Sequence, residues 1–179
     1  MSLAGVLAVF ASATTARADQ TDPLLDDLFA TLRASDGVAA GETVGRILDV
    51  WSKSQSDTVN LLDERAFASA TDGDYPLALA LSDHVVGLAP HFAQGYALRG
   101  VVKARLGDAE GAEKDFRKTL LLEPRQFEAS VALADLLLAS GRTRDAFQLL
   151  QDALKWNPHD RTALDRARAV RDLLARQDT

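Results

Sequence analysis

Three histidines, His84, His91 and His159, are the residues best suited to metal binding or acid–base chemistry. A metal site needs several His, Cys, Asp or Glu side chains that converge, often as two histidines four residues apart on one helix. The chain has no such histidine pair and no cysteine. We therefore expect surface or capping histidines, no metal site and no cofactor.

Serines and neighbouring carboxylates could support hydrolysis, but their spacing does not. No serine lies in a Gly-x-Ser-x-Gly turn, and no Gly-Lys-Ser/Thr follows the glycines Gly37 and Gly41. Asp26-Asp27 and Asp63-Glu64 are adjacent in sequence, so their side chains point in different directions on a helix. The sequence thus predicts a protein that is not an enzyme.

Composition excludes several other classes of protein. The chain has 179 residues, 47% of them hydrophobic, which is too apolar for a disordered tail. No apolar run approaches the roughly 20 residues of a membrane-spanning helix, so we expect no stable membrane insertion. The net charge of −6 argues against nucleic-acid binding, which requires clustered Lys and Arg. The composition therefore predicts a folded, soluble protein.

The N-terminal stretch, residues 3–18, reads LAGVLAVFASATTARA. An apolar run followed by small residues that end in Ala16-Arg17-Ala18 is typical of a secretory signal peptide with an A-x-A-like cleavage site. The basic residues usual at the beginning of such a signal are missing, and the alternative is a buried N-terminal helix. We expect residues 1–18 to be a signal peptide cleaved after Ala18, and the protein to be periplasmic or secreted.

Residues of three types recur with a period of 34. Glycine, alanine and proline each return in phase, as Gly73, Gly107 and Gly141, as Ala78, Ala112 and Ala146, and as Pro90, Pro124 and Pro158. Small residues also occupy one further in-phase position, as Ala66, Gly100 and Ala134. Three residue types in phase at one period indicate an internal repeat.

Each recurring residue has a structural role in a pair of helices. The stretch between a proline and the next glycine has the apolar spacing of an amphipathic helix, and the glycine ends it by adopting a left-handed conformation. Asp74 and Asp108 are suitable N-caps for the second helix. The alanine allows the two helices to approach closely, and the proline ends the second helix. The repeat is therefore a helical hairpin.

A period of 34 with these small residues and prolines resembles the tetratricopeptide repeat. The resemblance implies an all-α, right-handed solenoid with three repeats, at residues 59–92, 93–126 and 127–160. Residues 19–58 form an N-terminal helical hairpin that we expect to cover the open end of the first repeat. Residues 161–179 form a C-terminal capping helix, with Ala163, Leu164, Ala167, Val170 and Leu174 on one apolar stripe.

In this family the first helix of each repeat lines a concave groove. The candidate partner-binding residues are Asn60, Asp63, Phe67, Gln94, Val101, Arg105, Glu128, Val131 and Asp135. Family members that hold a chaperone's C-terminal carboxylates use Lys, Asn and Arg at positions that here carry Asp63, Phe67, Glu128 and Ala132. The resemblance thus argues against such a clamp. Basic and apolar side chains of a partner suit this surface better, although some of its apolar residues could instead pack between helices.

We expect a non-catalytic scaffold or adaptor of the bacterial cell envelope that binds a protein or peptide partner on the concave surface. The alternative is a self-assembling structural protein, a homo-oligomer that stacks end to end. Residues 19–90 hold 13 acids and 4 bases, whereas residues 91–179 hold 13 acids and 15 bases. That asymmetry would favour contact between opposite ends of two copies.

Overall fold

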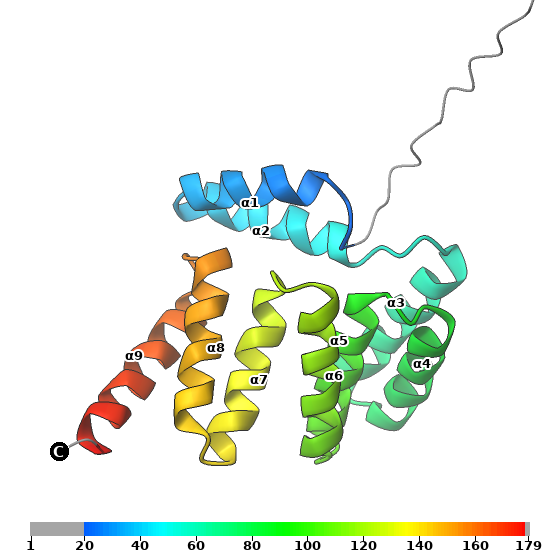
Figure 1. Cartoon of the computed structure of the whole chain (residues 1–179). Coiled ribbons are helices and arrows are strands. Elements are labelled where there is room, and N and C mark those ends of the chain that lie inside the picture. Colours follow the sequence, from blue (N-terminus) through cyan, green and yellow to red (C-terminus); the bar gives the residue numbers. More distant parts are fainter. Residues whose placement is uncertain (1–19, 178–179) are drawn as a thin grey trace, which may run out of the picture.

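The computed structural model describes residues 20–177, which form nine α-helices and no strand (Figure 1). The predicted signal peptide, residues 1–18, lies outside the described residues. The helices are α1 (Leu24–Ala34), α2 (Gly37–Trp51), α3 (Asp57–Thr71), α4 (Tyr75–Leu88), α5 (Ala93–Arg105), α6 (Ala109–Leu122), α7 (Phe127–Ala139), α8 (Thr143–Trp156) and α9 (Arg161–Gln177).

Helices α3 to α9 stand side by side in chain order, as a row of helical hairpins (Figure 1). Each helix packs against the next one, and α3 also touches α5. The pairs α3–α4, α5–α6 and α7–α8 correspond to the three predicted repeats. The all-α solenoid predicted from the period of 34 is therefore confirmed.

The turn inside each repeat depends on its glycine. Gly73, Gly107 and Gly141 have φ angles of 83°, 85° and 77°, a region that is costly for any residue with a Cβ. The next helix then begins at a side-chain cap, because Asp74 accepts from the Leu77 amide at 3.1 Å. Asp108 likewise accepts from the Gly111 amide at 2.9 Å. Both aspartates are N-caps, as predicted.

Small residues allow the helices of each repeat to pack closely. Ala66, Ala78, Ala112, Ala134 and Ala146 are fully buried. A Cβ added to Gly100 would lie 2.9 Å from Cε1 of Phe116, closer than real Cβ atoms approach a ring. The recurring small residues are thus required by close contact between helices, as their phase predicts.

The N-terminal hairpin corrects one expectation. Helices α1 and α2 do not cover the open end of the first repeat, but lie crosswise along one edge of the row, above α7 and α8 in Figure 1. Their apolar residues share a core with the third repeat and α9, and the Trp51 and Phe127 rings are 5.4 Å apart. Phe29 packs edge-on against Trp156 at 5.5 Å. The aromatic contacts available there explain this position.

Helix α9 closes the other side of this core. Ala163 and Val170 are buried, and Ala167 and Leu174 pack beside them, so most of the predicted apolar stripe contacts α8 and its neighbours. The opposite face of α9 carries exposed charged residues. No helix of the described range has both the length and the apolarity needed to cross a bilayer.

Candidate peptide-binding cleft

A cleft of about 170 Å³ lies between the first helices of the three repeats, α3, α5 and α7. We call it the concave cleft. Its lining consists of Phe67, Gln94, Ala97, Leu98, Val101, Phe116, Gln126, Glu128, Ala129 and Ala132. Four of the nine predicted partner-binding residues, Phe67, Gln94, Val101 and Glu128, therefore meet here although they come from three different helices.

The concave cleft presents apolar side chains to solvent over a buried apolar floor. Phe67 is 62% exposed and Val101 is 41% exposed, whereas Phe116 and Leu98 beneath are buried. An exposed phenylalanine has lost little of its contact with water on folding. It keeps most of the hydrophobic free energy that burial under a partner would release.

Asp63 lies one helical turn before Phe67, on the same face of α3. Its side chain is only 6% exposed, and its Oδ1 has no hydrogen-bond donor within the described part of the chain. Burial raises its pKa to about 7, and the negative charge of neighbouring Glu64 adds to the effect. A buried carboxyl without a donor is costly when ionised, so this side chain is unusual for a structural residue.

Two further predicted acids differ in their surroundings. Glu128 stays exposed at the rim of the concave cleft, where partial desolvation and then Asp160 raise its pKa. Asp135 pairs with Arg166 of α9, with 2.9 Å between Oδ2 and Nη2. Burial raises the pKa of Asp135 and the charge of Arg166 opposes that rise. Asp135 is thus already paired, whereas Glu128 has no cation within the described residues.

Five of the nine predicted residues do not line the concave cleft: Asp63 and Asp135, described above, and Asn60, Val131 and Arg105. Asn60 holds the α2–α3 linker, since its Oδ1 accepts from the Ser54 amide at 2.6 Å and its Nδ2 donates to the Ser54 carbonyl. Val131 is buried within the helix packing. Arg105 is exposed at the end of α5 and does not line the cleft.

Sequence reasoning missed Phe116 and Gln126. Phe116 belongs to α6, a second helix of its repeat, and reaches the cleft only because Gly100 has no side chain. Gln126 caps α7 by accepting from the Ala129 amide, and its Nε2 donates to Gln94 Oε1 at 3.0 Å. The position of Gln126 directly before a predicted helix was the one sequence feature that could have indicated its role as a cap.

The three histidines lie in different parts of the fold. His84 is exposed on α4, and the His91 carbonyl accepts from the side chain of Gln20. His159 Nε2 lies 3.1 Å from the Leu32 carbonyl, which ties α1 to the turn before α9. Among residues 20–177, no three metal-ligating side chains form a group that could hold a metal ion.

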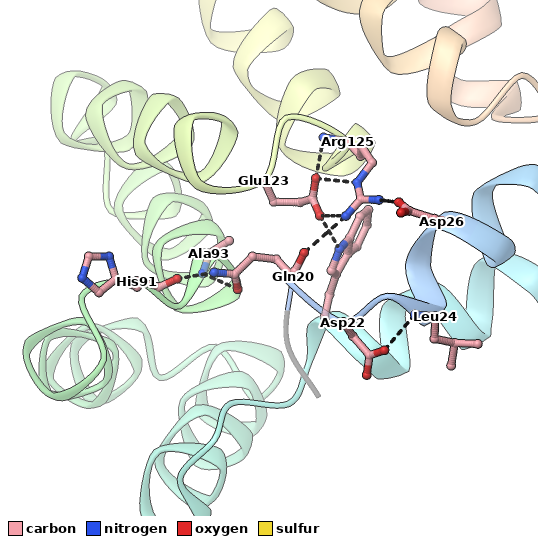
Figure 2. A network of polar contacts seen from close by, with 9 residues as sticks. Gln20, Asp22, Leu24, Asp26, His91, Ala93, Glu123 and Arg125 are labelled. Atoms are coloured by element: carbon pink, nitrogen blue, oxygen red, sulfur yellow. Dashed lines mark hydrogen bonds and ion pairs between the residues drawn. The ribbon is translucent and has the colours of Figure 1, made fainter. Parts of the chain in front are cut away.

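Arg125 fastens the N-terminal hairpin to the repeats (Figure 2). It makes three hydrogen bonds of 2.7 to 2.9 Å to the buried Glu123 carboxylate, two from its guanidinium and one from its backbone amide. Its Nη1 contacts Asp26 of α1 at 2.7 Å, and its Nη2 donates to the Gln20 carbonyl. The hydrogen bonds to Glu123, before any other cause, raise the pKa of Arg125. This docking network fixes α1 and α2 across the row of helices.

A larger depression of about 460 Å³ lies between residues 20–21, the α2–α3 linker and the turn at residues 88–92. Its lining contains no Asp, Glu, Lys or Arg and includes Leu88, which is 60% exposed. Asn60 and Ser54 bond to each other beside it. It offers no unpaired charge, so the concave cleft is the better candidate for specific binding.

A row of helical hairpins with a cleft on its concave side is typical of helical-repeat proteins. A family profile described as tetratricopeptide repeat matches residues 103–170. A TPR repeat-containing protein of Rhizobium etli is 30% identical over 152 residues, covering 84% of this chain and 74% of the relative. The chain belongs to the tetratricopeptide repeat family.

Solved structures show the same fold. The first TPR of Spaghetti (RPAP3), bound to the HSP90 peptide SRMEEVD, is 19% identical with a TM-score of 0.64 and covers 68% of this chain and 96% of that one. The Yersinia enterocolitica type III secretion chaperone SycD, in complex with a peptide of the translocator YopD, is 17% identical with a TM-score of 0.61. It covers 65% of this chain and 95% of SycD.

Proposed function

We propose that this protein is a non-catalytic adaptor of the bacterial cell envelope that holds a segment of a partner protein in its concave cleft. The exposed pair Phe67 and Val101 over a buried apolar floor is the observation that carries this proposal. Apolar anchors within a polar rim are the usual source of affinity in such an interface. The peptide complexes of two structures with the same fold support it.

The envelope part of the proposal depends on the sequence of residues 3–18. Expression of the full chain in a bacterial host, followed by fractionation and N-terminal sequencing, tests it. A mature protein that begins at Asp19 in the periplasm or medium supports export. A chain that keeps residues 1–18 in the cytoplasm contradicts it.

Loss of the apolar anchors tests the binding function. The full chain and its Phe67→Ala/Val101→Ala variant are used to capture proteins from envelope extract, and each bound set is identified by mass spectrometry. We expect the double variant to lose at least one partner at unchanged thermal stability, because both side chains are exposed. Leu121→Ala is the matched control, since Leu121 is 74% exposed and does not line the cleft. Identical bound sets for all three proteins would contradict the proposal.

Self-assembly is the second candidate, favoured by the acidic excess before residue 91 and the slight basic excess after it. Helices α3 and α9 stand at opposite ends of the row (Figure 1), so the two regions could meet between copies. Charge-driven stacking should dissolve at about 1 M salt, where the Debye length is about 3 Å. Sedimentation at low and high salt separates it from adaptor function.

A further inference from the structure

The charges around the concave cleft are unbalanced. None of the described residues that line it is Lys or Arg. Glu128 lies at the rim, whereas Asp63 does not line the cleft but lies one helical turn before Phe67 on α3. Oδ1 of Asp63 has no hydrogen-bond donor within the described residues, and no cation is among the causes that shift the pKa of either carboxyl. On α5, Arg99 and Lys103 both pair with Asp115, and Arg105 at the end of the helix is exposed and does not line the cleft. Glu128 is therefore the one charged residue among apolar and amide side chains that line the cleft, and the buried Asp63 carboxyl lies one turn from Phe67.

We propose that the cleft selects a partner segment that carries a lysine or arginine beside an apolar side chain. The cation pairs with Glu128 and Asp63, and the apolar side chain packs on Phe67 and Val101. This inference rests on the proposed adaptor function and adds the chemistry of the partner. Charge complementarity of this kind sets specificity by excluding acidic segments.

Burial makes this selection depend on pH. Desolvation raises the pKa values of both carboxyls, that of Asp63 to about 7. Glu64 on α3 itself adds to the shift of Asp63 and Asp160 to that of Glu128, so no cation offsets either shift. On α4, which also packs against α3, the charged groups are Asp83 and His84; Asp83 pairs with Arg99. A bound cation favours the ionised carboxylate, so binding releases a proton and strengthens as pH rises toward 7.

A random library of short displayed peptides tests the selectivity. Bound pools are sequenced for the full wild-type chain, Asp63→Asn, Glu128→Gln and the controls Asp49→Asn and Glu42→Gln, which change exposed acids of α2. We expect several-fold enrichment of Lys or Arg next to an apolar residue in the wild-type and control pools. Both cleft variants should lose this enrichment, and Glu128→Lys should shift the pool toward Asp and Glu.

The affinity of the most enriched peptide is then measured from about pH 5 to pH 8. For the wild type we expect affinity to rise with pH by at most about tenfold per unit and to level off above pH 7. The rise should be smaller in Asp63→Asn. A wild-type pool with apolar enrichment but no preference for cations would overturn this inference and leave the adaptor function standing. A wild-type pool that matches the unselected library would contradict both.

Discussion

Asp63 is a buried carboxyl whose pKa lies well above its ordinary value. Its pKa is about 7 in the folded protein and 3.8 in a solvated chain. Between these two values the folded state binds more protons than the unfolded state, so stability falls as pH rises. Pairing with a partner's cation, as proposed above, would offset this cost.

Replacing Asp63 with Asn should remove this pH dependence. One pKa unit corresponds to about 1.4 kcal/mol. Relative to Asp63→Asn, the wild type should therefore lose about 3 kcal/mol of unfolding free energy between about pH 5 and pH 8, with the rest of the effect at lower pH. Urea unfolding of both proteins at the two pH values measures the difference.

Asp49→Asn is the control for this measurement, because Asp49 is exposed on α2. Its unfolding free energy should follow that of the wild type at both pH values. If Asp63→Asn also follows the wild type within about 0.5 kcal/mol, the Asp63 carboxyl is not desolvated as described.

At the scale of elements, the position of α1 and α2 depends on the docking network. Glu123 is 2% exposed in its side chain, and Arg125 is its only cation among the described residues (Figure 2). Arg125 also stacks over Phe29, with 5.2 Å between the guanidinium carbon and the ring centroid. One side chain thus joins the turn between α6 and α7 to the N-terminal hairpin.

Arg125→Met should destabilise the protein by about 3 kcal/mol, because it leaves the Glu123 carboxylate buried without its cation. Partial release of α1 and α2 should make the linker at residues 52–56 sensitive to proteases. Chemical unfolding and limited proteolysis measure the two effects. Adding Glu123→Gln to this variant should restore part of the stability.

Lys114→Met provides the comparison. Lys114 pairs with Glu110 at 2.7 Å, but both side chains are more than 70% exposed, so the loss of stability should be much smaller than in Arg125→Met. Equal losses in the two single variants would show that the docking network adds nothing beyond a surface ion pair.

At the scale of the whole molecule, periodicity predicted the row of hairpins and not the place of α1 and α2. A period of 34 records features within the repeats, such as the helix contact at Ala112 and the turn at Gly107. The period does not predict the contact between Asp26 and Arg125, which are 99 residues apart in sequence. A helix pair outside the period can dock wherever its apolar face finds aromatic partners.

The same limit applies to the concave cleft. Phe67, Gln94, Val101 and Glu128 could be predicted from the family resemblance, which implies that these positions of each first helix face the concave groove. Phe116 could not, since it enters from the second layer through the space left by Gly100. The pairing of Asp135 with Arg166 depends on how α9 packs, which no local pattern specifies.

Site-specific photo-crosslinking tests the central claim, a partner segment held in the concave cleft, most directly. A photoreactive residue is placed at Val101 or, as the control, at Leu121, and the full chain is irradiated in envelope extract. We predict a discrete crosslinked partner from Val101 that is absent from Leu121, and a crosslinked peptide that contains Lys or Arg. Equal products from both positions, or only crosslinks between copies of this chain, would contradict the account.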